Sequence, residues 1–419
     1  MSFQQPRNVQ AVIRVIGVGG GGSNAIDRMI EDGVQDVTFV AINTDAQVLR
    51  NSKADYRICI GERLTRGMGA GGDPTVGEKA AEETNDELYE ILKGTDMVFI
   101  TAGMGGGTGT GAAPIVASIA QDLGILTVAV VTKPFKFEGN KRLQQAERGL
   151  EQLRKYVDAL VVVPNDRLVE AYAKRGISIL QGFQIVDGVL RQGIQGVADL
   201  ITKTGMVNVD FADVKTILAN SGEALMSIGT GAGENRIQQA IEAAMSSPLL
   251  DVEIRGAKRI LLNITSNENI KLTEIAEAAN TIEAIVDPDA NIIWGSVIDP
   301  NFPADQVKIT LVATGISNFR QKTQLPSRQV TRETEKRVAP ESPQPRVPSS
   351  DNRDVRDQRP IRPTVATQPP PPPPAANPPR SGSPLAGGRR GDDSAQRPYE
   401  ENPNIMIPPG LRDDLRRKN

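Results

Sequence analysis

The chain has 419 residues, enough for two or three domains, and hydrophobic residues make up 39% of it, enough to form real cores. It has no histidine and a single cysteine, Cys59, which excludes Ser-His-Asp and Cys-His catalysis, histidine metal sites and an intramolecular disulfide. After Arg320 there are 18 Lys and Arg against 12 Asp and Glu, so the net charge of −3 leaves −9 for the first 320 residues, a poor match for nucleic-acid binding.

The N-terminus, "MSFQQPRNVQ", lacks the charged and apolar regions of a signal peptide. No apolar stretch approaches the ~18 to 20 residues of a membrane span. Together with the lone Cys59, which fits a reducing compartment, these features predict a cytoplasmic protein. Cys59 lies in the apolar run 56–61, and we expect it to be a buried strand thiol.

The first 177 residues alternate short apolar runs with helical patterns. The runs are rich in branched residues, as expected of strands covered on both faces, and lie at 12–17, 37–43, 97–103, 126–132 and 159–164. Helical spacing of three and four residues between apolar positions occurs at 24–33, 76–94, 110–124 and 140–157. This order predicts an α/β domain, residues 1–177, built on a doubly wound parallel sheet.

Glycine-rich loops follow the strands, at the edge where doubly wound folds bind ligands. The first, Gly17–Ala25, contains G-x-G-x-x-G, and Asn43–Asp45 ends the next strand where a Rossmann fold places its ribose carboxylate. A nicotinamide-dependent oxidoreductase is therefore one alternative. The second loop, Ala102–Pro114, has six glycines in thirteen residues, and Thr108 and Thr110 add hydroxyls where a helix begins.

A third glycine cluster, Gly67–Pro74, precedes another helix. Any one of these segments could be only a tight strand-to-helix turn. All three at one sheet edge favour a chain of phosphates instead. No Lys-Ser/Thr pair closes the second loop, so it is not a P-loop.

A long helix, 178–203, leads to a second block, 204–320, which we expect to be a smaller α+β domain. Its predicted strands lie at 224–231, 259–266, 291–298 and 307–315, and its two obvious helices at 234–246 and 272–286. The segment 321–402 contains most of the 20 prolines found after Arg320 and one aromatic residue, so we expect a disordered linker before a C-terminal peptide, 403–419.

The loop "GGGTGTG" after a strand is similar to the signature loop of the tubulin superfamily. Together with "GVGGGGSNA", "NTD" and "NVDFADV", in order over residues 9–320, it resembles the FtsZ family of bacterial cell-division GTPases. The resemblance implies a GTP-binding domain and a smaller domain joined by a long central helix. It also implies head-to-tail filaments that form the contractile division ring at the future septum, at midcell.

The resemblance assigns roles along the glycine loops and beyond them. The implied nucleotide contacts are Gly20, Gly21, Gly22, Ser23, Asn24, Ala70, Gly71, Gly107, Thr108, Gly109, Glu138, Arg142, Asn165, Phe183 and Asp187. Asp187 would accept hydrogen bonds from guanine N1 and N2, Asn165 would bond the base edge, and Phe183 would stack on the ring. Structural alternatives are an i, i+4 pair for Glu138 and Arg142, a core position for Phe183 and a solvated helix position for Asp187.

The segment "TGMVNVDFADV" supplies the polar groups that the glycine loops lack. Asp210 and Asp213 share a helix face, and both also fit a structural role as N-cap and first-turn acid. By chain order they follow the long helix, on the side of the domain opposite the loops. In the resembled family this loop, here Asn208, Asp210 and Asp213, reaches the GTP of the next subunit, where Mg²⁺ assists hydrolysis.

The last residues form a short apolar and basic island after the linker. The resemblance implies a peptide, Ile405–Arg417, that docks on membrane-tether and division-regulator proteins, with Gly410 standing where a bulky residue is usual. An ordinary charged terminus is the alternative. The sequence is thus compatible with three functional classes: a self-assembling GTPase, a nicotinamide-dependent oxidoreductase, and a nucleotide-binding scaffold without turnover.

Overall fold

The computed structural model describes residues 11–172, 176, 178–203, 205, 207, 209–247, 254 and 256–316. Asn208, the linker 321–402 and the peptide 403–419 lie outside these residues. All of the described residues belong to one compact unit of the chain. No helix among the described residues is long and apolar enough to cross a membrane.

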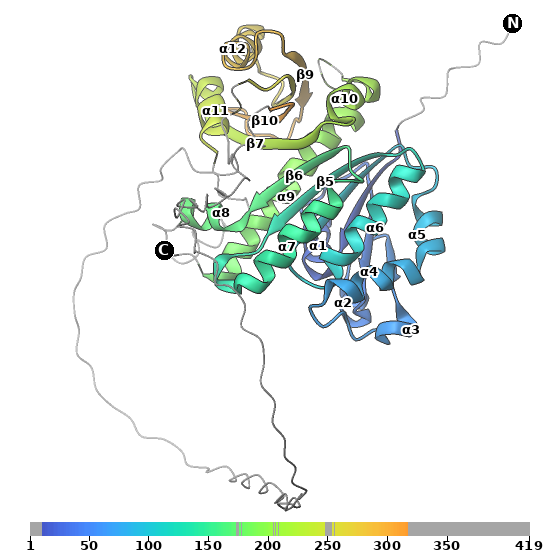
Figure 1. Ribbon diagram of the computed structural model, residues 1–419. Helices are drawn as coiled ribbons and strands as arrows, with labels where there is room; N and C mark the ends of the chain where they lie inside the picture. Colours follow the sequence, from blue (N-terminus) through green and yellow to red (C-terminus); the bar gives the residue numbers. More distant parts are fainter. Residues whose placement is uncertain are drawn as a thin grey trace, which may run out of the picture. The chain divides into compact units, whose positions relative to one another are not determined.

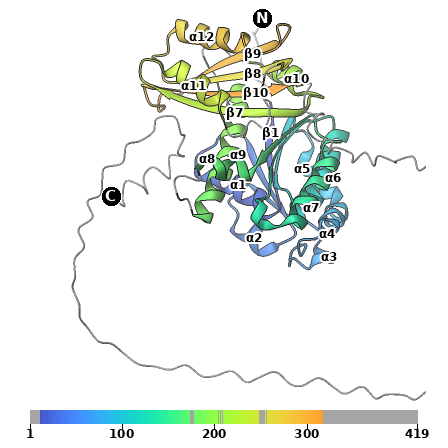
Figure 2. The ribbon, with the colours of Figure 1, turned by 60° about the vertical axis from the view of Figure 1, so that its left-hand side comes forward.

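The described residues form one ten-stranded sheet in the order β3-β2-β1-β4-β5-β6-β7-β10-β8-β9. Its strands are drawn as arrows in Figures 1 and 2. The strands are β1 (Ile13–Val18), β2 (Thr38–Asn43), β3 (Tyr56–Cys59), β4 (Met97–Gly103), β5 (Leu126–Lys133), β6 (Ala159–Pro164), β7 (Gly222–Ala232), β8 (Arg259–Ser266), β9 (Asn291–Ile298) and β10 (Gln306–Thr314). The pairings among β1 to β6 are all parallel. The five strands expected in the first block are confirmed, and β3 carries Cys59, which is half-buried rather than buried.

Helices cover both faces of the parallel strands. In chain order the helices are α1 (Gly19–Glu31), α2 (Ala46–Asn51), α3 (Glu62–Thr65), α4 (Pro74–Glu83), α5 (Asn85–Leu92), α6 (Thr108–Asp122), α7 (Asn140–Leu153), α8 (Asn165–Tyr172), α9 (Ile179–Thr202), α10 (Phe211–Leu218), α11 (Arg236–Met245) and α12 (Leu272–Glu283), with a 3-10 turn η1 (Lys136–Glu138). One core joins the sheet to α1, α9 and α10, and a second joins the opposite face to α4 to α7 (Figures 1 and 2). The doubly wound α/β fold is therefore confirmed.

The second block continues the same sheet. β7 pairs in parallel with β6 over only three residue pairs, from Ala159–Gly222 to Val161–Ala224. It then pairs antiparallel with β10 over nine, and a third core lies between these strands and α11 with α12. This hydrogen-bonded joint was not expected from the sequence, because strand partners on either side of a 24-residue helix leave no local signal.

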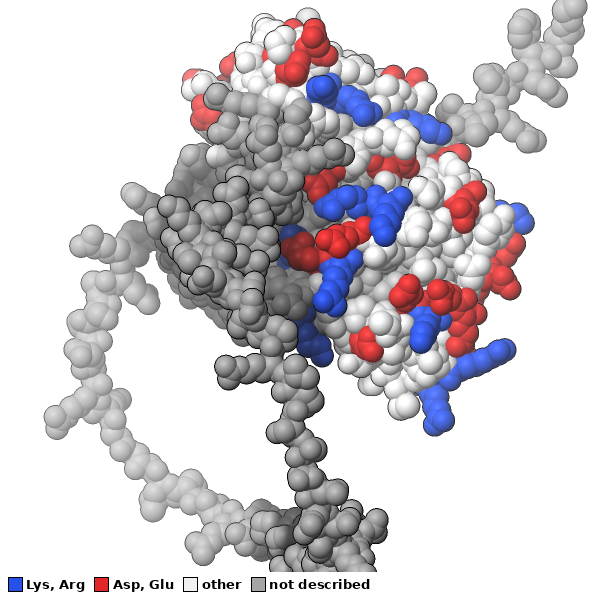
Figure 3. Space-filling model, viewed as in Figure 1, with Lys and Arg blue, Asp and Glu red and all other residues white. Residues whose placement is uncertain are grey.

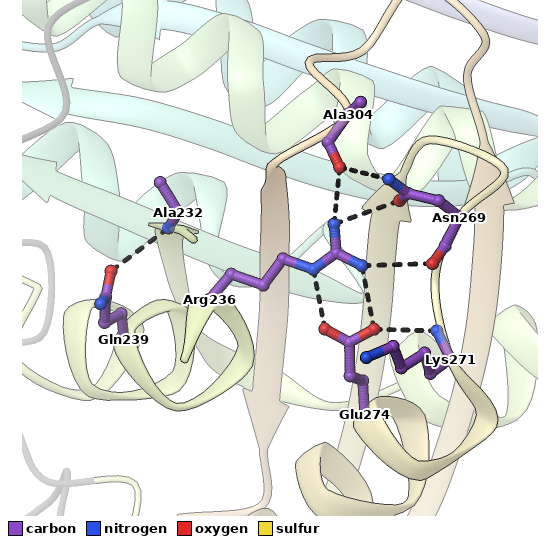
Figure 4. A network of polar contacts seen from close by, with 7 residues as sticks. All are labelled: Ala232, Arg236, Gln239, Asn269, Lys271, Glu274 and Ala304. Carbon is purple, nitrogen blue, oxygen red and sulfur yellow. Dashed lines mark hydrogen bonds and ion pairs between the residues drawn. The ribbon is translucent and has the colours of Figure 1, made fainter. Parts of the chain in front are cut away.

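One guanidinium ties α11 to α12 (Figure 4). Arg236 donates from Nε and Nη2 to the carboxylate of Glu274 at 2.7 and 2.9 Å, and from Nη1 and Nη2 to Asn269 Oδ1, Asn269 O and Ala304 O. Glu274 also accepts from the backbone N–H of Lys271 at 2.8 Å, which caps α12. The network therefore fixes the start of α12 against two loops.

Candidate functional site

Three glycine-rich segments meet at the carboxyl edge of the parallel strands. Gly69 N donates to Thr44 O at 3.0 Å, which joins the 67–74 segment to the end of β2. Thr44 Oγ1 and Thr108 Oγ1 share a hydrogen bond of 2.7 Å, which joins β2 to the start of α6. The loop after β1 lies equally close, since a Cβ at Gly19 would lie 2.8 Å from Gly109 N. The convergence expected from the sequence is observed.

The glycines at this edge are of two kinds. Some are needed for packing: a Cβ at Gly22 would lie 2.4 Å from Thr101 O, and one at Gly107 only 2.8 Å from the Cβ of Ala70. Others have no heavy atom within 4 Å of an added Cβ, and these are Gly20, Gly71, Gly72 and Gly106. Each of the three segments thus leaves bare backbone beside open space, a surface that can accept a ligand at close range.

Two helices point their N-termini at this edge. Neither α1 nor α6 has a side-chain cap or an acidic residue in its first turn, so their first N–H groups are free for an anion. Thr110 Oγ1 accepts from Gly105 N at 2.8 Å, which shapes the loop, and the buried hydroxyl of Ser23 has no partner. This arrangement fits phosphate groups.

A stripe on α1 connects the phosphate end to an acidic residue on α9. Gly20, Asn24 and Arg28 follow one another at four-residue steps, about 12 Å in all, and both Gly20 and Asn24 are exposed. Arg28 Nε lies 2.8 Å from Asp187 Oδ2. The Asp187 side chain is only 13% exposed, and burial raises its pKa to about 6 against the opposing charge of Arg28.

Aromatic rings and an amide lie at the same end of the site. Phe183, one turn before Asp187, is 40% exposed and meets Phe135 edge to face at 5.2 Å, so it is not a core residue. Asn165 begins α8, is 4% exposed, and its Oδ1 has no hydrogen-bond partner. An exposed ring, an amide oxygen without a hydrogen-bond partner and a largely buried carboxylate together suit a planar polar base.

Glu138 and Arg142 form the ion pair that their spacing indicates. Glu138 also accepts from Phe135 N at 2.9 Å, and the carbonyl of Arg142 faces Gly105, where a Cβ would lie 2.7 Å away. One turn on, Gln145 donates to Gly72 O at 3.2 Å. The pair therefore links η1 to the first turn of α7, rather than lying within one helix, and it borders the glycine loops.

The structure does not bring Asp210 and Asp213 to this edge. Asp210 caps α10 by accepting from Asp213 N at 2.8 Å, and both side chains are exposed. After α10, the N–H groups of Ser221 and Gly222 donate to Asp158 O, directly before β6 begins. α10 therefore lies at the amino edge of the parallel strands, opposite the glycine loops and away from α2 and α3 (Figures 1 and 2).

Comparison with known proteins identifies the family. Residues 12–173 match the GTPase domain of the Tubulin/FtsZ family, and residues 222–317 match the C-terminal domain of the FtsZ family. A structure of an empty FtsZ dimer from M. jannaschii is 46% identical, with a TM-score of 0.71 over 74% of this chain and 90% of that one. The chain belongs to the FtsZ family. It is accordingly a GTPase that binds GTP and GDP, and nothing favours the nicotinamide-dependent alternative.

More distant structures share the FtsZ fold. CetZ1 from Haloferax volcanii, a GDP-bound monomer, is 24% identical, with a TM-score of 0.65 over 73% of this chain and 95% of that one. CetZ2 from Haloferax volcanii, a GTPγS-bound protofilament, is 21% identical, with a TM-score of 0.60 over 72% and 92%. These two matches support the architecture alone.

Three residues that lie at this site in the structure were not predicted from the sequence. Arg28 was detectable as a cation four residues after Asn24 on the exposed face of α1, and Thr44 as the centre of "NTD". Phe135 carries no such signal, because its role as a wall for Phe183 depends on packing between the residue directly before η1 and α9.

Proposed function

We propose that this protein is a self-assembling GTPase whose subunits polymerise head to tail and complete each other's active sites. The observation that carries the proposal is the separation of Asp210 and Asp213 from the glycine loops by the length of the parallel strands. One subunit cannot bring both to one GTP, whereas a head-to-tail neighbour can. Such a heterologous contact does not close and so extends into a filament.

The bound nucleotide would run along α1. The backbone of Gly20–Asn24, Ala70, Gly71 and Gly107–Gly109 would hold the phosphates at the two helix N-termini. Glu138 and Arg142 would contact the ribose and phosphates. Asp187 would accept from the guanine N1 and N2 donors, with Asn165 on the base edge and Phe183 against the ring.

Asp210 and Asp213 of the neighbouring subunit, with Asn208, would orient and polarise the attacking water. Among the described residues, no group of three or more Cys, Asp and Glu could hold a metal ion. We propose that Mg²⁺ binds to the phosphates of GTP, where it would offset charge on the γ-phosphate.

The cellular setting follows from the same proposal. We propose a cytoplasmic protein that acts in the division ring at midcell and docks on membrane tethers and division regulators through Ile405–Arg417. Among the described residues on the face shown in Figure 3, Lys and Arg are interspersed with Asp and Glu, which supports a proposal without a nucleic-acid partner.

The primary test follows 90° light scattering and phosphate release together, with GTP, GDP, ATP and NADH. We expect both polymer formation and phosphate release with GTP and Mg²⁺, and neither with the other three nucleotides. If ATP stimulated polymerisation and phosphate release to a comparable extent, the proposal that the site recognises guanine would be wrong. Hydrolysis at high dilution, with no concentration threshold, would show that one subunit suffices.

A mixing experiment tests the shared site directly. Gly20→Asp places a carboxylate in open space beside the phosphates and should abolish GTP binding without a clash. Asp213→Ala should bind GTP within a few-fold of the parent and hydrolyse almost none. A mixture of the two variants should regain GTP hydrolysis, because Asp213→Ala binds GTP and Gly20→Asp supplies the intact Asp210 and Asp213. Glu283→Ala, which removes an exposed acid from α12, is the control that should hydrolyse normally.

A further inference from the structure

Two ion pairs, one helical turn apart, join α1 to α9. Arg28 of α1 pairs with Asp187 of α9 at 2.8 Å. Four residues further along the chain from each partner the polarity reverses, and Arg191 of α9 pairs at 2.7 Å with Asp32, the residue directly after α1. Either pair alone would tie the helices together, so helix docking does not by itself account for Arg28.

The surroundings of the two acids differ. The Asp32 side chain is 53% exposed, whereas the Asp187 side chain, paired with Arg28 of α1, is only 13% exposed. Arg191, the next charge on α9, is engaged by Asp32, and the ring of Phe135 contributes no charge. Arg28 is the only charged group among the described residues that lowers the pKa of Asp187, against burial that raises it.

We propose that Arg28 is a positioning residue for base recognition, which holds the Asp187 carboxylate ionised and oriented so that it selects guanine. This inference rests on the proposed role of Asp187. An ionised carboxylate has only acceptors, and guanine offers two adjacent donors, N1–H and N2–H. A protonated carboxyl group carries an O–H donor, which would face one of the guanine N–H donors. The complementarity between two acceptors and two donors would then be lost.

The test compares GDP with inosine diphosphate, which lacks the 2-amino donor, by calorimetric titration of the full chain between pH 5.5 and 8.5. The affinity ratio is the readout, because titration of the phosphates is common to both ligands. For the parent we expect a preference for GDP on the order of tenfold at neutral pH, the value of one charge-assisted hydrogen bond. The preference should fall as the pH drops through about 6, where Asp187 takes up a proton.

Arg28→Gln should move this midpoint up by about one pH unit or more, since the opposite charge is lost, and should reduce the GDP preference at pH 7. Arg28→Lys keeps the charge and should keep the midpoint near that of the parent, with a smaller loss of preference. Arg191→Gln breaks the neighbouring pair between the same helices. It should leave both the ratio and the midpoint unchanged.

The outcomes separate the two hypotheses. If Asp187→Asn retains the parent preference for GDP, Asp187 does not recognise the base, and the proposed guanine site is wrong. If Asp187→Asn loses the preference while Arg28→Gln keeps the parent ratio and pH profile, the role of Arg28 is refuted. Equal losses in Arg28→Gln and Arg191→Gln would also refute it, because they would show a general effect of helix docking.

Discussion

Replacement of Arg236 by methionine should destabilise the second half of the sheet severely. The guanidinium and the Glu274 carboxylate are only 7% and 15% exposed, and Arg236 donates five hydrogen bonds. Truncation removes all five donors and leaves a largely buried carboxylate without its counter-charge. Loss of one partner from a buried pair costs about 3–5 kcal/mol, a large part of the roughly 5–15 kcal/mol that stabilises a typical domain.

The assay uses the fluorescence of Trp294, the only tryptophan of the chain, which lies on β9 and packs against the same core as α11 and α12. Urea unfolding followed at Trp294 should shift to lower urea for Arg236→Met and about half as far for Arg236→Lys. The pKa of Glu274 is lowered chiefly by Arg236, so this stabilisation is present at neutral pH and is lost as the pH falls below the usual value of 4.5. The gap between parent and variant should therefore narrow in acid.

The matched control is Arg154→Met, which removes a more exposed pair with Glu223 and should cost at most about 1 kcal/mol. If Arg236→Met unfolds within about 0.5 kcal/mol of the parent, the network carries little stability and the reasoning fails.

Three further results are expected. Gly111→Ala should lower the urea midpoint by an amount worth about 1–3 kcal/mol, because its Cβ would lie 2.0 Å from Pro74 O; an unchanged midpoint would mean that α4 and α6 can separate freely. Cys59 should react with iodoacetamide at pH 8 more slowly than a free cysteine and approach that rate in urea, since burial and then nearby carboxylates raise its thiol pKa; equal rates in the native protein would contradict this. Truncation after Arg320 should leave GTP hydrolysis and filament formation largely intact in the scattering assay, and loss of either would assign a function to the linker.

Much of the fold was predictable because its signals are local. Strands buried on both faces must be continuously apolar, as 97–103 and 126–132 are, and the positions of glycine loops after strands indicated the ligand edge. The contacts between charged residues at the site were harder to predict from the sequence. Arg28 and Asp187 are far apart in the chain, and nothing in either segment indicates that α1 and α9 pack together. For the same reason, the pairing of β6 with β7 could not be predicted from the sequence.

The order of strands has a consequence for cooperativity. The edge strands of the ten-stranded sheet, β3 and β9, carry Cys59 and Trp294, so the natural sequence has one probe at each edge. Nine strand spacings, roughly 43 Å, separate them. Pulsed alkylation of Cys59 and emission of Trp294 can thus be followed in the same unfolding experiment without any substitution. Coincident transitions would show that three residue pairs between β6 and β7, with the cores beside them, make the whole sheet melt as one unit, and separate transitions would locate the break at that joint.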